Sequence, residues 1–328
     1  PPPPPPHPPP PPPPPPPRLD SSAASDVYKR QALARRYHVS PMVIALTVVA
    51  FGTSLPELVV VVEAALTGYP GLVFGNVVGS NIANILLVAG AAAVVYPLTY
   101  GEHSVRRDSV VMIAATVLLI LLSLNGTLGR VEGVVLLAGL AGVTLLTVRE
   151  ATRMYRDSDV KPPLEWALGL PTNLWMIALF ILVGAIGLPV GAHLVVDASV
   201  EMATHLGVDE TLIGLTILAL GTSLPELATT VVAAIQKRTE VAIGTVVGSN
   251  IFNILAILGV GAVVSPIPFT VSREFFTLNF PVMLGTAVLL SVFVWMRKPI
   301  GRPAGIVLLA WYVTYIAVLV LRSRGLMY

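Results

Sequence analysis

Residues 52–58 read Gly52-Thr-Ser-Leu-Pro-Glu-Leu58, and the same seven residues return as Gly221-Thr-Ser-Leu-Pro-Glu-Leu227. A second segment, Gly79-Ser-Asn-Ile-Ala-Asn-Ile-Leu86, returns as Gly248-Ser-Asn-Ile-Phe-Asn-Ile-Leu255 at the same offset of 169 residues. Aligned without a gap, residues 50–90 and 219–259 share 22 identities in 41 positions. Unrelated apolar segments would not keep one register over this length, so the chain contains an internal duplication.

The composition places most of this duplicated chain in lipid. Hydrophobic residues make up 55% and charged residues 12%, whereas a soluble domain has about 25% charged residues. From residue 40 onward, apolar runs long enough to cross a bilayer follow one another, and nine in succession exclude a soluble protein. They cover roughly residues 41–66, 71–95, 109–124, 131–148, 173–196, 211–235, 241–264, 276–296 and 304–321. The sequence therefore predicts an all-α polytopic membrane protein.

The offset also indicates how the two halves relate. The span at 173–196 opens the second half, and its counterpart would fall at 4–27, where the sequence has a proline tract and a polar linker. We expect the first helix of the first repeat to be absent, which leaves four helices in the first half and five in the second. Because a complete half has an odd number of spans, the two copies are expected to have inverted topology.

Positive loop charges test this inversion independently. Thirteen Lys or Arg residues fall at one set of span ends, and only Arg130, Arg273, Arg322 and Arg324 fall at the other set. By the positive-inside rule, the first set is cytoplasmic, and the two Pro-Glu motifs then run in opposite directions across the membrane. The expected location is the cell membrane, specifically a prokaryotic inner membrane.

Four segments are expected along the chain: a proline-rich or polar head at 1–31, a first membrane repeat at 32–148, a cytoplasmic linker at 149–172 and a second membrane repeat at 173–328. The head is expected to be disordered, with a non-native origin as the alternative that stays open. Its 16 prolines give a polyproline rod that cannot cross a bilayer. The net charge is only +2 and the basic residues are scattered, so the sequence shows no basic patch that would bind nucleic acid. The lipid bilayer is the expected surrounding, no protein partner is assigned, and a monomer is the oligomeric state considered.

Each Pro-Glu motif carries the chemistry of half a cation site. A carboxylate inside a membrane span is costly and is retained where it faces protein, water or a cation, and Glu57 and Glu226 occupy equivalent mid-span positions. Pro56 and Pro225 are expected to interrupt a helix and free backbone carbonyls. Hydroxyls precede both glutamates, from Thr53, Ser54, Thr222 and Ser223. Carboxylate, carbonyl and hydroxyl oxygens are ligands for hard cations such as calcium or sodium.

The second motif adds neutral oxygen ligands that share one helical face. They are Ser80 and Asn84 in the first copy and Ser249 and Asn253 in the second. Asn81 and Asn250 fall on another face, and the glycines of the motif favour close helix packing, so structural roles are expected for both. Packing is also the alternative reading of the serine and asparagine pairs.

Other acidic residues are expected to lie outside the site. Glu63 aligns with Val232 in the second copy, so it is expected near a helix interface. Four further acidic residues on the predicted outer side are expected to lie in a solvated loop. The alternative is that they attract cations to the entrance of the transport pathway. This group consists of Asp197, Glu201, Asp209 and Glu210.

The paired motifs resemble the two alpha repeats of the sodium/calcium exchanger family, in the calcium/cation antiporter superfamily, and especially its bacterial members. The resemblance covers about residues 32–328 and implies five helices per half and exchange of Ca²⁺ for Na⁺ by alternating access. It implies that Glu57 and Glu226 bind calcium beside the carbonyls of Thr53 and Thr222. Further residues match positions that line the ion sites, namely Ala50, Ser54, Ser80, Asn84, Ala219, Ser223 and Ser249.

Several alternatives stay open at this point. Many exchangers carry aspartate where this chain has Asn253, so H⁺ or K⁺ remain alternatives to Na⁺ as coupling ion. A passive channel and a truncated copy without transport activity are the competing hypotheses. An enzyme is not expected, because no nucleophile or histidine accompanies the two glutamates. No covalently bound cofactor is expected either, since Ca²⁺ and Na⁺ would be transported ions.

Overall fold

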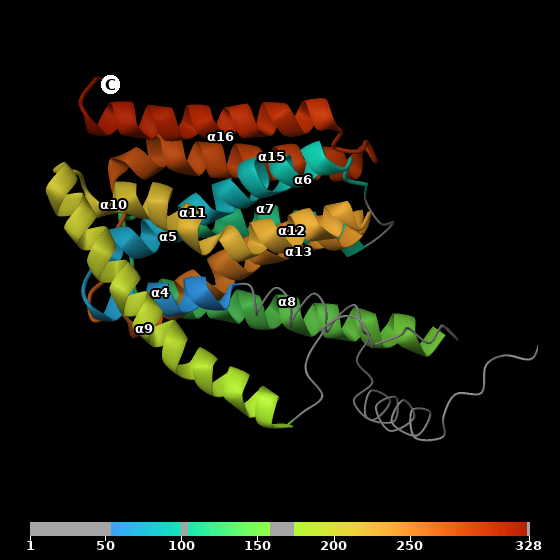
Figure 1. Cartoon of the computed structure of the whole chain (residues 1–328), viewed down its shortest axis with the longest axis horizontal. Helices are drawn as coiled ribbons and strands as arrows, with labels where there is room; N and C mark the ends of the chain where they lie inside the picture. Colours follow the sequence, from blue (N-terminus) through green and yellow to red (C-terminus); the bar gives the residue numbers. More distant parts are fainter. Residues whose placement is uncertain (1–53, 100–103, 158–173, 327–328) are drawn as a thin grey trace, which may run out of the picture.

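The computed structural model describes residues 54–99, 104–157 and 174–326. The predicted head at 1–31, and the predicted ligands Ala50 and Thr53, lie outside the described residues. Within the described ranges the chain is almost entirely helical, and most helices run side by side along the long axis of the molecule, with α9 crossing them obliquely (Figure 1).

The first half contains the helices α4 (Leu55–Leu66), α5 (Pro70–Ala83), the π-helix η2 (Asn84–Ala89), α6 (Gly90–Val95), α7 (Ser104–Leu122) and α8 (Arg130–Asp157), with the short strand β1 (Thr127–Leu128) before α8. The second half begins with α9 (Leu174–Leu206), α10 (Glu210–Ile213), η3 (Gly214–Leu218), α11 (Ala219–Thr222) and α12 (Leu224–Ile235). It continues with α13 (Thr239–Phe252), η4 (Asn253–Leu258), α14 (Gly259–Val264), the strand β2 (Phe269–Thr270), η5 (Phe275–Asn279), α15 (Phe280–Trp295) and α16 (Arg302–Ser323).

The helix boundaries repeat as the sequence predicts. Helices α4 and α12 begin and end 169 residues apart, and so do α5 and α13, η2 and η4, and α6 and α14. Equivalent residues therefore adopt the same local structure in both halves. The all-α polytopic fold of two inverted helical repeats is confirmed.

The number of membrane spans agrees with the sequence in part. By length and hydropathy, five of the described helical segments can cross a bilayer, or six if the bent pair around Ser223 is one span. The sequence predicts nine spans. Three predicted spans are not among these six segments. They correspond to α4, α7 and α9, which are helical in the structure. Helix α4 is described for 12 residues. Helix α7 starts with a charged turn that contains Arg106, Arg107 and Asp108.

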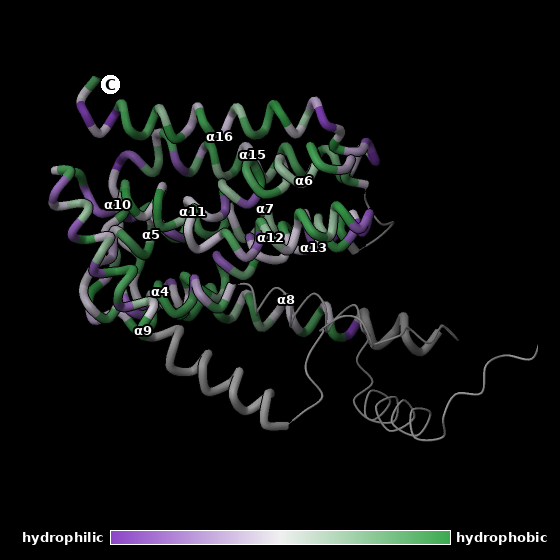
Figure 2. Tube along the Cα trace, in the orientation of Figure 1, coloured by the Kyte–Doolittle hydropathy of each residue, from purple (hydrophilic) through white to green (hydrophobic). Residues whose placement is uncertain are grey.

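Two equivalent segments form the centre of the bundle. In Pro70–Val95 and Thr239–Val264, 83% and 78% of the apolar window is buried, compared with 11% in Arg130–Arg149. Hydrophobic residues line the outer helix α16, with hydrophilic residues at its two ends (Figure 2). Because Ile306, Val307 and Val313 of α16 are 58–67% exposed, a lipid environment accounts for this outer face.

The central helices approach closely because small residues line their contact. A Cβ added at Gly79 would lie 2.6 Å from the carbonyl oxygen of Leu215, and one added at Gly75 would lie 2.6 Å from that of Thr211. Helix α5 therefore packs directly on the backbone of α10 and η3, which confirms the packing role expected for these two glycines. This contact holds one face of α5 against the second repeat.

Candidate cation site

A helix begins two residues before each of the two glutamates. Ser54 and Ser223 directly precede these helices, with φ/ψ near −89°/7° and −83°/2°. At Ser223, α11 and α12 meet at an angle of 43°. The expected interruption of a helix is confirmed at Pro225, because α11 ends at Thr222 and α12 begins at Leu224. Pro56 and Pro225 both stand in the first turn of the helix that follows, where a proline needs no N–H and is favoured.

Both glutamates stand in the first turn of the new helices, where the backbone N–H groups favour a negative charge. Glu57 and Glu226 are each 1% exposed. Their carboxyl groups interact with each other across the interface between the repeats, and the Ser54 hydroxyl donates to Glu226 Oε1 at 3.0 Å. Two buried carboxyl groups in contact require protons or cations to balance their charge.

The second motif brings a further cross-repeat pair to the centre. Asn253 Nδ2 donates to Ser80 Oγ at 3.0 Å, and Ser80 Oγ donates to the carbonyl of Val77 at 3.1 Å. Asn84 and Ser249 are equally buried, and their polar side-chain atoms have no hydrogen-bond partner among the described residues. Buried polar atoms of this kind are expected where a ligand completes the hydrogen-bonding or coordination shell.

Each central helix changes to a π-helix at its asparagine. The π-helix η2 begins at Asn84, and η4 begins at Asn253. A π-helical turn is wider than an α-helical turn and leaves some carbonyls without their usual partner, which is why such turns often mark functional sites. The sequence did not predict these turns, although both start at residues chosen as ligands.

The structure thus brings most of the predicted ligands together in the buried centre. Nine of the twelve are polar side chains in described positions with at most 9% exposure, namely Ser54, Glu57, Ser80, Asn84, Thr222, Ser223, Glu226, Ser249 and Asn253. Ala219 is fully buried, and its carbonyl accepts hydrogen bonds from the backbone N–H of Ser223 and the hydroxyl of Thr222. The remaining two, Ala50 and Thr53, lie outside the described residues.

One residue of this centre was missed at the sequence level. Thr222 Oγ1 donates to Asn76 Oδ1 at 3.0 Å, and Asn76 is fully buried. Asn76 stands four residues before Ser80, on the same face of α5, so the polar spacing was a usable signal. The repeat comparison passed over it because the equivalent residue is Thr245.

The residues expected to be structural behave accordingly. Asn81 Nδ2 donates to the carbonyl of Val77 at 2.7 Å, and Asn250 Nδ2 donates to the carbonyl of Asn81 at 3.2 Å. Glu63 contacts His193 of α9, with 3.0 Å between Oε1 and Nδ1. It therefore lies at a helix interface, away from the paired glutamates.

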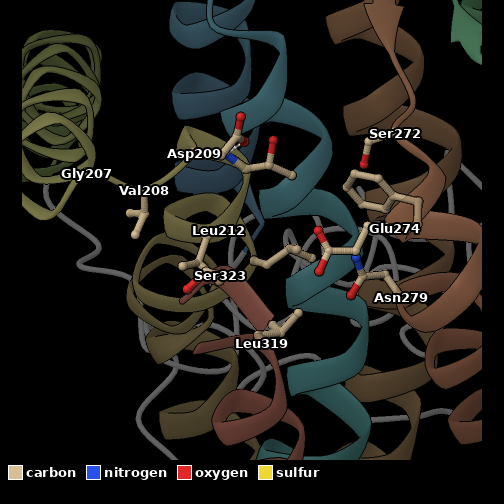
Figure 3. Close-up of a pocket in the computed structure, with 12 residues that line it drawn as sticks. Gly207, Val208, Asp209, Leu212, Ser272, Glu274, Asn279, Leu319 and Ser323 are labelled. Atoms are coloured by element: carbon tan, nitrogen blue, oxygen red, sulfur yellow. Dashed lines mark hydrogen bonds between the residues drawn. The ribbon is translucent and has the colours of Figure 1, made fainter. Parts of the chain in front are cut away.

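A separate cavity of about 290 Å³ lies beside α10, η5 and the end of α16 (Figure 3). Asp209 and Glu274 stand at this cavity together with Asn279, whose Oδ1 accepts a hydrogen bond from Tyr315 at 2.9 Å. Asp209 also accepts a hydrogen bond from the backbone N–H of Thr211 at 2.7 Å and so caps α10. The predicted cation ligands are not among the residues that line this cavity.

The buried centre offers oxygen ligands of two kinds, namely the carboxylates of Glu57 and Glu226 and neutral hydroxyl and amide groups. Oxygen ligands of this kind suit hard cations. Among the described residues, no group of three or more His, Cys, Asp or Glu side chains is arranged to hold a metal ion.

The family model described as sodium/calcium exchanger protein matches residues 26–149 and 176–321. The chain belongs to the sodium/calcium exchanger family. It is 36% identical to the inner membrane protein YrbG of Escherichia coli (strain K12), over 91% of this chain and 92% of that protein. It is 33% identical to the sodium/calcium exchanger MaX1 of Methanosarcina acetivorans, over 90% of this chain and 94% of that protein.

A solved structure gives the same result. The sodium-calcium exchanger NCX_Mj, soaked with Na⁺ and Sr²⁺, superimposes with a TM-score of 0.64 at 31% sequence identity. The match covers 87% of this chain and 89% of that chain. The membership makes this chain an integral membrane cation antiporter and not an enzyme, as the sequence predicts.

Proposed function

We propose that this chain exports Ca²⁺ in exchange for Na⁺ by alternating access, with both ions bound in turn at the Glu57 and Glu226 pair. The observation that carries this proposal is the contact between two buried carboxyl groups, one from each inverted repeat. Their two negative charges match one Ca²⁺ or two Na⁺ ions. Since both loads need the same carboxylates, the ions compete and are not carried together.

The same charges favour exchange over a passive channel. An empty site would move two buried carboxylates through the low-dielectric interior without compensation, which is costly. The protein is therefore expected to change its open face when it carries a load, and this couples the movement of one ion to the return of another. Inverted repeats with broken helices are typical of alternating-access transporters.

The remaining ligands are assigned from the buried oxygen atoms and from the family resemblance. Ca²⁺ takes about six to eight oxygens, and sodium also accepts carbonyl and hydroxyl oxygens. We assign Ca²⁺ to the two glutamates and the carbonyls of Thr53 and Thr222. The proposed sodium ligands are Ala50, Ser54, Ser80, Asn84, Ala219, Ser223, Ser249 and Asn253.

The hydrogen bonds of the centre support two alternative states. Asn253 donates to Ser80, but in the equivalent pair Asn84 and Ser249 have no partner among the described residues. The repeats are nearly identical in sequence here, so the pair that is absent can form equally well. We take the present arrangement as the state open to one side, and its mirror arrangement as the state open to the other.

Asn253 bears on the identity of the coupling ion. A neutral amide at this position leaves two carboxylates in the centre, which suffices for Ca²⁺ or two Na⁺ but leaves no third carboxylate for a further cation or proton. Two Na⁺, two K⁺ or two H⁺ would balance these carboxylates equally, so Na⁺ is proposed from membership of the sodium/calcium exchanger family. The relative named inner membrane protein supports a prokaryotic inner membrane as the location.

The test is a comparison of coupling ions in proteoliposomes that contain the full chain. Radioactive Ca²⁺ uptake is followed after an outward gradient of Na⁺, K⁺ or H⁺ is imposed, each of equal magnitude and at a clamped membrane potential. Uptake driven by Na⁺ alone supports the proposal. If H⁺ or K⁺ drives the uptake, that ion and not Na⁺ is the coupling ion. Downhill Ca²⁺ flux of equal size under every gradient would indicate a channel.

A further inference from the structure

Asn76 is a buried polar residue that contacts the predicted ligands but belongs neither to the repeat motifs nor to the ligand assignment. Its side chain is fully buried in α5, and its Oδ1 accepts the hydrogen bond from Thr222 Oγ1 at 3.0 Å. Its Nδ2 has no hydrogen-bond partner among the described residues. A buried amide N–H without a partner costs free energy, so this arrangement calls for an explanation.

The position of Asn76 places it beside the proposed ligands. Asn76, Ser80 and Asn84 succeed one another at intervals of four residues, so they share one face of the α5 and η2 segment. Thr222, which Asn76 contacts, stands one turn before Glu226. Asn76 therefore lies between the second motif of the first repeat and the first motif of the second repeat.

A half-turn of the Asn76 amide would give its N–H group a partner and leave only its oxygen without one. The amide oxygen and nitrogen are almost equal in size, and a hydroxyl can both donate and accept. After the turn, Nδ2 donates to Thr222 Oγ1, and the Thr222 hydroxyl donates to the carbonyl of Ala219, which already lies 3.4 Å away. Oδ1 then takes the place of the unpartnered nitrogen and requires a positive partner.

The other buried amides show what a packing role looks like in this protein. Asn81 and Asn250 use Nδ2 to bind backbone carbonyls, and it is their Oδ1 atoms that have no partner among the described residues. Asn76 instead contacts a hydroxyl of the ion site. At the equivalent position of the second repeat, the Thr245 hydroxyl donates to the carbonyl of Val241 within its own helix, at 2.9 Å. The Asn76 amide therefore has no equivalent amide at position 245 of the second repeat.

We infer that Asn76 is a further cation ligand, whose amide turns its oxygen toward the Na⁺ or Ca²⁺ ion held by Thr222 and Glu226. The inference rests on the proposed function for the identity of the ion. It adds a neutral oxygen to one side of a site whose other ligands come in symmetric pairs. The ion bound on that side is expected to be held more tightly than its symmetric counterpart.

The test measures cation binding by the full chain in detergent, by titration calorimetry and by the cation-dependent rise in unfolding temperature. Asn76→Leu removes the oxygen at similar volume and is expected to weaken binding of Ca²⁺, Na⁺ or both by about 10-fold to 100-fold. Asn76→Asp keeps an oxygen at this place and is expected to retain binding. Thr245→Val is the matched control in the second repeat, and it is expected to bind like the wild type.

Unchanged affinity for both ions in Asn76→Leu would overturn the inference. Equal weakening in Asn76→Leu and Asn76→Asp would also overturn it, because the amide nitrogen and not the oxygen would then matter. If Asn76→Leu does not fold, Asn76→Thr replaces it, since threonine at the equivalent position bonds to its own helix. A wild type that binds Ca²⁺ without exchanging it for Na⁺ would contradict the proposed function alone, and one that binds neither ion would contradict both.

Discussion

The Ser54 hydroxyl donates a hydrogen bond to Glu226 Oε1 at 3.0 Å, and so joins the first repeat to the carboxylate of the second. The symmetric pair would be Ser223 with Glu57, but Ser223 Oγ has no hydrogen-bond partner among the described residues. A nearly symmetric sequence therefore forms an asymmetric centre. This asymmetry is what an alternating-access transporter needs, since its two end states differ in which repeat holds which contact.

Ser54→Ala and Ser223→Ala are expected to shift the two end states in opposite directions. Ser54→Ala removes a contact of the present state, and Ser223→Ala removes the corresponding contact of its mirror state. A hydrogen bond to a charged group stabilises by about 1.5–3 kcal/mol, so each shift is about tenfold or more. The measurement is the half-saturating Ca²⁺ concentration at each face of oriented vesicles. Shifts in the same direction would contradict the mirror-state account.

Glu57→Gln and Glu226→Gln are each expected to lower exchange by about 100-fold or more, since each leaves one carboxylate to balance a divalent ion. Flux in proteoliposomes is the measurement, with elution of folded protein as a check. Glu63→Gln is the matched control: Glu63 stands in α4 with Glu57 but contacts His193 of α9. Loss of flux in this control equal to that of Glu57→Gln would argue against a special role for the pair.

Asn253→Asp is expected to change the ion preference without unfolding the protein. The present amide donates to Ser80 at 3.0 Å, whereas an aspartate would accept a hydrogen bond from Ser80 and add a third carboxylate. The added charge should favour a further cation or proton in the load, so K⁺ or pH dependence should appear. The Na⁺, K⁺ and pH dependence of Ca²⁺ uptake is compared with that of the wild type. Identical profiles would show that position 253 does not set the coupling ion.

Gly79→Ala is expected to destabilise the protein by about 1–3 kcal/mol, because overpacking forces the close backbones apart. The added Cβ would lie 2.6 Å from the Leu215 carbonyl and 2.8 Å from the Ala219 side chain. Gly285→Ala in α15 is the control, since a Cβ there meets nothing within 4 Å. Thermal unfolding of both variants checks the difference. An equal effect at the two positions would contradict the packing role of Gly79.

The duplicated segments made the repeat architecture predictable. Equal residues at a fixed offset yield equal helices, as Leu55–Leu66 and Leu224–Ile235 show. The glutamates were identifiable because a carboxylate in an apolar span demands a reason, and burial of Glu57 and Glu226 agrees with that argument. The assignment of individual oxygens to individual ions stays a prediction.

Other features depend on packing that no local pattern records. The exact position of the break, at Ser223 and two residues before Pro225, is one such feature. The π-helical turns that begin at Asn84 and Asn253 arise where two helices pack. A repeated sequence does not indicate which of two symmetric hydrogen-bond pairs forms, because both pairs use the same residue types. Asn76 was missed because it breaks that symmetry.

Uphill Ca²⁺ accumulation tests the central claim most directly. Proteoliposomes loaded with Na⁺ are diluted into Na⁺-free buffer that contains a trace of Ca²⁺, and internal Ca²⁺ is followed for the wild type and Glu226→Gln. The account predicts that wild-type vesicles concentrate Ca²⁺ above the external level while the Na⁺ gradient lasts, and that the variant does not. Accumulation that persists in Glu226→Gln, or wild-type flux that never exceeds equilibration, would contradict exchange at the paired carboxylates.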